Sequence, residues 1–158
     1  MSEILAYIGP GLAEALATIG TTVGIYDAVA AGLPAVSEDP GQRGRVLALA
    51  FLPSTQTLVY GFVYMFLMYS SYLPALLKKY PQIPPNIATG IFGVSIFVGF
   101  AELFSAWMQG KVCAEGASQL IKTRGAIFGS TIILAAYEEF VGILGMVFGI
   151  LMASMLTA

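Results

Sequence analysis

Two adjacent carboxylates, Glu138 and Glu139, lie in the middle of the last long apolar run of the sequence, residues 126–156. About 20 apolar residues are enough to span a bilayer, and this run is longer and contains no Lys or Arg. A carboxylate at mid-membrane costs several kcal/mol unless it is paired, protonated or bound to a cation. These residue types at this depth therefore indicate an ion or proton site.

The composition is that of an integral membrane protein. Of the 158 residues, 58% are hydrophobic and 10% are charged, whereas about 25% of residues are charged in a typical soluble domain. The sequence contains no His and one Cys, which excludes histidine chemistry and an internal disulfide. It has no basic stripe of the kind that binds nucleic acid. No Lys or Arg precedes the first apolar run, so we expect no signal peptide.

The candidate site must be positioned by transmembrane helices, because four apolar runs take up nearly the whole length. We expect an all-α membrane protein with helices at about residues 10–36, 45–72, 86–121 and 126–156. They form a single membrane domain over residues 1–158, as two tandem helical hairpins at about 10–72 and 86–157. Pro10 is expected at the start of the first helix, where its missing N–H is harmless. Residues 70–85 contain four prolines and are expected to form a loop.

The basic residues predict the orientation in the cell membrane. The two short turns, between the first and second and between the third and fourth helices, carry most of them, whereas the middle loop carries only Lys78 and Lys79. Cytoplasmic loops are enriched in Lys and Arg. We therefore expect a multi-pass protein with both short turns in the cytoplasm and both termini outside. The basic residues at the short turns are Arg43, Arg45, Lys122 and Arg124.

The two hairpins carry an internal repeat. The pattern G-x-V-aromatic-x-x-L begins at Gly61 and again at Gly145, an offset of 84 residues. The second hairpin therefore resembles a copy of the first, and both enter the membrane from the same side. Small residues such as Gly20 and Gly24 predict that the first helix packs closely against others. That packing fits either the inner wall of an assembly or an ordinary bundle.

Polar residues of three helices fall at a similar depth. Counting from the short turns places Gln56, Gln109 and Glu139 about 18–21 Å from the same helix ends, so they can meet. Thr55 adjoins Gln56, and Tyr60 lies one turn further on. Hard cations prefer oxygen ligands, whereas a proton needs only the carboxyl group and a hydrogen-bond partner. The set therefore favours Na⁺, with H⁺ as the alternative. Each Gln alone is better explained by interhelical hydrogen bonding, and it is their common depth with Glu139 that favours a site.

Three motifs in the second, third and fourth spans carry a resemblance to a known family. The motifs are Leu52-Pro53-Ser54-Thr55-Gln56, then Leu103-Phe104-Ser105 with Gln109-Gly110-Lys111-Val112, and then Ala135-Ala136-x-x-Glu139-x-x-x-Ile143-Leu144-Gly145. With these motifs the chain resembles the proteolipid (K or c) subunit of V-type and A-type rotary ATPases, in the duplicated four-helix form, and is most similar to the sodium-translocating bacterial members. The resemblance covers nearly the whole chain.

The resemblance implies a ligand set and selects Glu139 over Glu138. Ser54 stands where members with a single hairpin have a Glu, so one site per chain is implied. The family has a Tyr three residues after this Gln, whereas here Tyr60 is fourth, and a π-helical bulge can take up the extra residue. Tyr60 is implied to hydrogen-bond the carboxylate. The implied ligands are the backbone carbonyl of Leu52 and the side chains of Thr55, Gln56, Gln109 and Glu139.

The implied function is that of an ion-carrying rotor-ring subunit without catalytic activity of its own. The sequence has no nucleotide-binding motif, so ATP hydrolysis is expected on other subunits of a soluble head. The expected partners are identical copies in a ring, a membrane stator subunit with an Arg, central-stalk subunits at the cytoplasmic loops, and the lipid bilayer. The alternative is a free-standing four-helix cation or drug exchanger with an essential membrane Glu. Asp27 and Glu102 are further acids within the spans, and they are protonated, face the ring lumen or support the site.

Overall fold

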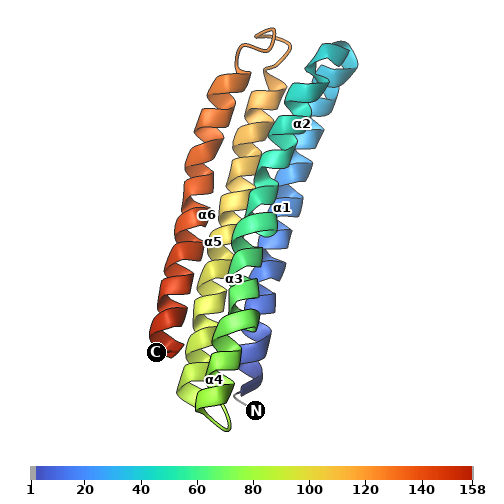
Figure 1. Cartoon of the computed structure of the whole chain (residues 1–158). Helices are drawn as coiled ribbons and strands as arrows, with labels where there is room; N and C mark the ends of the chain where they lie inside the picture. Colours follow the sequence, from blue (N-terminus) through green and yellow to red (C-terminus); the bar gives the residue numbers. More distant parts are fainter. Residues whose placement is uncertain (1–2, 158) are drawn as a thin grey trace.

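A computed structural model describes residues 3–157, and the chain folds into long helices that lie side by side (Figure 1). Four of its stretches are long and apolar enough to cross a membrane. The prediction of an all-α protein with four spans is therefore confirmed. The spans are α1 (Glu3–Glu38), the segmented helix Pro40–Lys79, α5 (Pro85–Ser118) and α6 (Phe128–Thr157).

The four spans form two hairpins that run in the same sense. The turns that follow α1 and α5 lie at one end of the bundle, and both termini lie with the loop before α5 at the other end (Figure 1). The closest packing is between α1 and α5, where a Cβ atom on Gly110 would overlap the backbone of Gly24. The small residues of the first helix thus allow two backbones of the same chain to approach closely.

The first helix begins at Glu3, so the expected start at residue 10 is wrong and Pro10 lies inside α1. A proline in a helix interior removes one backbone hydrogen bond and displaces the turn before it. Here a side chain from the segmented helix repairs the turn. The Tyr69 hydroxyl donates to the Tyr7 carbonyl at 2.5 Å and accepts from the Gly11 N–H at 3.2 Å. Such a neighbouring partner makes an interior proline tolerable in a membrane helix.

The second span is helical to Lys79, so the loop expected over residues 70–85 is limited to residues 80–84. Pro74 does not end the helix, because it lies in the first turn of a new segment, where its missing N–H costs little. Changes of helical pitch divide this span into segments. They are η1 (Pro40–Gln42), α2 (Arg43–Phe51), the 3₁₀ turn η2 (Leu52–Ser54), the π-helical η3 (Gln56–Gly61), α3 (Phe62–Leu67), the π-helical η4 (Met68–Tyr72) and α4 (Leu73–Lys79).

The third helix ends at Ser118, three residues before the expected end, and a turn leads into α6. Arg124 and Gly125 in that turn have positive φ values of 52° and 81°, and the Gly125 N–H bonds the Leu120 carbonyl at 2.8 Å. The guanidinium group of Arg45 lies directly against Gly125. The two short turns therefore meet at this end of the bundle, which gathers the basic residues that the sequence predicted to lie together.

The turn between α1 and the segmented helix is held by Asp39. Its carboxylate accepts from the side-chain amide of Gln42 at 2.7 Å and from the Gly41 N–H at 2.9 Å. These two hydrogen bonds, with the amide of Gln42 as the larger cause, hold the pKa of Asp39 below its usual value. The side-chain carbonyl of Gln42 in turn accepts from Arg45 at 2.8 Å.

The core has a polar layer between two apolar clusters. One cluster surrounds Tyr64 and Ile91 towards the end with the termini, and the other surrounds Leu49 and Cys113 towards the short turns. Along the helices six of the buried polar residues fall between members of the two clusters, so the polar layer is at mid-height. The buried polar residues of this layer are Thr21, Ser54, Gln56, Glu102, Ser105 and Gln109.

Candidate ion-binding site

The oxygens of the segmented helix are brought together by Pro53. The ring of a proline disturbs the helix around it, and a 3₁₀ turn at Leu52–Ser54 passes directly into the π-helical η3. As a result, the Thr55 hydroxyl lies 3.0 Å from the Leu52 carbonyl oxygen and 3.1 Å from Gln56 Oε1. Three oxygens of different chemistry, a backbone carbonyl, a hydroxyl and an amide, therefore lie next to each other.

Tyr60 connects this oxygen set to Glu139 on α6. Its hydroxyl donates a hydrogen bond of 2.9 Å to Glu139 Oε1. Tyr60 lies within η3, so the extra residue between Gln56 and Tyr60 is accommodated by a π-helical segment. Both Glu138 and Glu139 are partly buried. The π-helical turn thus directs the Tyr60 hydroxyl at the carboxylate that the motif spacing selects.

Gln109 on α5 is completely buried, and only one of the two polar groups of its side-chain amide has a hydrogen-bond partner. Its amino group donates to the Ala135 carbonyl at 3.2 Å, but its Oε1 has no hydrogen-bond partner. Ala135 precedes Glu139 by four residues, which is about one turn of α6. An amide oxygen without a partner is therefore buried about one turn from the carboxylate.

Gln56 is also completely buried and lies on the other side of Glu139. Its Cγ would be 3.4 Å from a Cβ atom on Gly142, and its amino group donates to Ser105 Oγ at 2.9 Å. Gly142 follows Glu139 by three residues on α6. The two glutamines therefore contact α6 on either side of Glu139, Gln109 at the Ala135 carbonyl and Gln56 beside Gly142.

Further carboxyl groups surround this layer. Glu102 is completely buried, neither of its carboxyl oxygens has a partner, and Oε2 would lie 2.8 Å from a Cβ atom on Gly142. Glu14 Oε2 is likewise buried without a partner and lies against Gly61. Asp27 instead pairs with Lys111, at 3.9 Å between Oδ2 and Nζ. Of the extra acids, Glu102 borders the candidate site, whereas Asp27 is balanced by a cation between α1 and α5.

Sequence reasoning treated Ser105 only as part of a motif, yet it is the residue that joins Gln56 to α6. Its Oγ donates to the Glu138 carbonyl at 2.6 Å and accepts from Gln56. The available signal was its spacing, because Ser105 and Gln109 are four residues apart and share one face of a helix.

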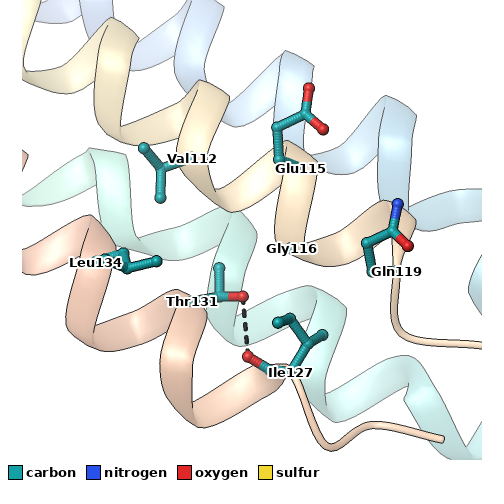
Figure 2. Close-up of a pocket in the computed structure, with 7 residues that line it drawn as sticks. All are labelled: Val112, Glu115, Gly116, Gln119, Ile127, Thr131 and Leu134. Carbon is teal, nitrogen blue, oxygen red and sulfur yellow. Dashed lines mark hydrogen bonds between the residues drawn. The ribbon is translucent and has the colours of Figure 1, made fainter. Parts of the chain in front are cut away.

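A hollow near the short turns is separate from this set. This cavity of about 310 Å³ lies between the end of α5 and the start of α6, and none of the predicted ligands lines it (Figure 2). Figure 2 shows the Thr131 hydroxyl bonded to the Ile127 carbonyl, a distance of 3.0 Å. A Cβ atom on Gly116 would overlap Thr131, so the two helices are in contact beside the cavity.

Chemically, the candidate site offers only oxygen donors to a cation. It contains the carboxylate of Glu139, the amide oxygens of Gln56 and Gln109, the Thr55 hydroxyl and the Leu52 carbonyl. Carbonyl, hydroxyl and carboxylate oxygens are the donors that hard cations take. The unpartnered oxygen of Gln109 shows that the residues present fit a cation or a further hydrogen-bond donor at this point.

Comparisons with known proteins agree with the duplicated architecture. A sequence model that describes the C subunit of ATP synthase matches residues 8–68 and again residues 92–152. The offset between the two matches is the 84 residues of the internal repeat. The chain is 31% identical over 156 residues to the V-type sodium ATPase subunit K of Enterococcus hirae, which covers 94% of this chain and 90% of that protein.

A second relative is archaeal. The chain is 30% identical over 149 residues to the A-type ATP synthase subunit K of Methanocaldococcus jannaschii, which covers 94% of this chain. The chain spans 61% of the length of that relative.

Proposed function

Because the chain belongs to the family of ATP synthase C subunits, as a duplicated proteolipid of the V-type and A-type ATPases, we propose that it carries one Na⁺ at mid-membrane as its ring rotates. The proposed ligands are Glu139, Gln109, Gln56, Thr55 and the backbone carbonyl of Leu52, with Tyr60 supporting the carboxylate. Rotation is coupled to ATP hydrolysis on other subunits, so this chain is a non-catalytic part of the machine.

The unpartnered oxygen of Gln109 is the observation that carries this proposal. Leaving a buried amide oxygen without a partner costs about 1–3 kcal/mol, yet the amino group of the same side chain is bonded to Ala135. The bond to Ala135 therefore holds the Gln109 amide in an orientation that leaves its oxygen without a hydrogen-bond partner. A cation bound between this oxygen and Glu139 removes the cost, and so would a protonated Glu139 that donates to it. The additional oxygens of Gln56, Thr55 and Leu52 favour the cation, because a proton needs no further oxygen ligands.

The relatives support Na⁺ to different degrees. The name of the Enterococcus hirae protein specifies a sodium ATPase, whereas that of the archaeal protein specifies no ion. The oxygen-rich surroundings of Glu139 favour the sodium alternative for this chain. A proton ring, in which the glutamines act only as hydrogen-bond partners, is the competing possibility that carbodiimide labelling separates from it.

The proposed mechanism follows from the charge of Glu139. One monovalent cation neutralises one carboxylate, so a loaded site can face lipid at low cost. At the stator an Arg displaces the cation electrostatically and keeps the two access channels apart. Glu139 is suited to this exchange because it is partly exposed on α6, near the exposed side chains of Tyr137 and Phe140.

The proposed partners follow from the two ends of the bundle. Identical copies complete the ring, and the exposed apolar side chains of α6 face neighbouring copies, the stator or lipid. The central stalk contacts the end that carries the two short turns, where Arg45 lies against Gly125. The enrichment of Lys and Arg at this end predicts that it lies in the cytoplasm and that the termini lie outside.

The deciding experiment is carbodiimide labelling of the purified protein, because carbodiimides react with protonated carboxyl groups in apolar surroundings. The modified residue is mapped across a range of pH, with and without millimolar Na⁺. The expected result is labelling at Glu139 that Na⁺ suppresses. A Glu139→Gln variant should abolish this labelling, and the matched Glu138→Gln variant should retain it.

Three other results would contradict parts of the proposal. Labelling at Glu139 that depends on pH but not on Na⁺ would make this a proton ring. Labelling mainly at Glu138 or Glu102 would show that the ion site is wrongly assigned. Isolation of the protein as a monomer, instead of a uniform detergent-resistant ring, would favour the free-standing exchanger.

A further inference from the structure

Ser105 on α5 connects α6 and the segmented helix through its hydroxyl group. It is 1% exposed, donates to the Glu138 carbonyl at 2.6 Å and accepts from Gln56 Nε2 at 2.9 Å. The bond to Glu138 fixes the backbone next to the proposed carrier Glu139. The bond to Gln56 fixes a proposed ligand on the segmented helix.

The direction of these two bonds determines which way the Gln56 amide faces. A hydroxyl group has one proton, and a backbone carbonyl can only accept. With its proton on the Glu138 carbonyl, Ser105 Oγ can only accept from Gln56, so the amino group must point at Ser105. The opposite orientation would bring the Gln56 amide oxygen against a hydroxyl oxygen without a proton between them. Gln56 Oε1 is therefore directed towards Thr55.

We propose that Ser105 is a positioning residue for the ion site, which orients the Gln56 amide so that its oxygen, and not its amino group, faces the cation. This inference rests on the proposed function, because the orientation matters only if the oxygen is a ligand. A flipped amide would present two N–H groups to a cation, which it would repel. Ser105 thus acts on the affinity of the site without touching the ion.

The first hairpin contains a related arrangement, in which both partners lie on the segmented helix. Residue 105 corresponds to residue 21 at the 84-residue offset of the two family matches. The Thr21 hydroxyl donates to the Pro53 carbonyl at 2.8 Å and accepts from the Thr57 hydroxyl at 2.8 Å. In both halves a hydroxyl group on the first helix of the hairpin donates to a carbonyl on the second helix of the same hairpin. It also accepts from a polar side chain of the segmented helix. Only in the second half is the donating side chain an amide with an oxygen to direct.

The space around Ser105 leaves little freedom for another arrangement. Its Oγ would lie 2.9 Å from a Cβ atom on Gly142. Gly142 therefore allows the hydroxyl to reach α6, and the close packing prevents the side chain from turning elsewhere. Thr is the residue at the corresponding position of the first half, so it is the conservative replacement that keeps the hydroxyl.

The test measures the Na⁺ concentration that gives half-maximal protection of Glu139 from carbodiimide in the intact ring. In Ser105→Ala this concentration is expected to rise about three- to tenfold, the effect of one neutral hydrogen bond. Each concentration is compared with the labelling rate of the same variant without Na⁺, so a change in the reactivity of Glu139 itself does not enter the comparison. Ser105→Thr should restore the wild-type value, and Ser105→Cys, of nearly the same shape but with weak hydrogen bonding, should resemble Ala.

The matched control is Ser95→Ala. Ser95 is also completely buried on α5, and its hydroxyl bonds Ile91 and Tyr64 instead of the site. A similar rise in Ser95→Ala, or no rise in Ser105→Ala and Ser105→Cys, would overturn the positioning role. If Na⁺ protects Glu139 in neither the wild type nor the variants, the proposed sodium function fails instead, so the two failures are distinguishable.

Discussion

The hydroxyl group of Tyr60 on the segmented helix donates a 2.9 Å hydrogen bond to Glu139 on α6, and it does so from within a π-helical turn. This bond directly joins the second helix of one hairpin to the second helix of the other. It also occupies one oxygen of the proposed carrier and leaves the other available. The π-helical turn of the second span therefore carries the hydroxyl group that holds the carboxylate.

Replacing Tyr60 with Phe is expected to weaken Na⁺ binding about tenfold. A hydrogen bond to a charged group contributes about 1.5–3 kcal/mol, and without it Glu139 loses its fixed orientation. The measurement is the half-protecting Na⁺ concentration in carbodiimide labelling. Tyr137→Phe is the control, because Tyr137 is 70% exposed on the same helix as Glu139. Equal values for both variants would show that the Tyr60 bond contributes nothing to the site.

Replacing Glu102 with Gln is expected to stabilise the ring by about 1 kcal/mol or more. The carboxyl group is completely buried and neither oxygen has a partner, so its ionised form is costly and the two proteins are compared at alkaline pH. Gln keeps the shape and removes the charge. Thermal unfolding in detergent would show a higher melting temperature, whereas Glu115→Gln, an exposed position on the same helix, should show no change. A lower melting temperature for Glu102→Gln would mean that the carboxylate has a partner in the assembled ring.

Replacing Tyr69 with Phe is expected to destabilise the protein by about 1–3 kcal/mol. The hydroxyl group bridges the Gly11 N–H and the Tyr7 carbonyl around Pro10, and its loss leaves both without this partner. The measurement is the melting temperature in detergent. Tyr26→Phe on α1 is the control, since Tyr26 is 70% exposed. If the two variants have the same melting temperature, the stability of the turn at Pro10 does not depend on the Tyr69 hydroxyl group.

Replacing Gly125 with Ala is expected to cost about 1–2 kcal/mol, because its φ of 81° is unfavourable for a residue with a Cβ atom. The new methyl group would also lie 2.5 Å from Cζ of Arg45, so the guanidinium would have to move. Gly44→Ala is the opposite case. It lies in α2 with nothing within 4 Å of the new atom, so helix propensity alone should stabilise the protein slightly. The same loss in both variants would rule out the backbone explanation.

The sequence by itself determined the number of spans and their pairing into two related hairpins, and it is the source of the proposal that Glu139 is the carrier. These properties are local, since the length and hydropathy of a run decide whether it spans a bilayer. Motif spacing selects Glu139 because it compares residues along one chain segment. The approximate depth of Gln56 and Gln109 also followed from counting residues along a helix of known rise.

Only the tertiary structure decided how the polar groups are partnered. Pro10 was expected to begin a helix, and it lies inside one because Tyr69, 59 residues away in the sequence, repairs the turn. The free oxygen of Gln109 and the orientation of the Gln56 amide depend on bonds to other helices. Such partners are chosen by interhelical packing, and a buried polar group must find one wherever the fold brings it.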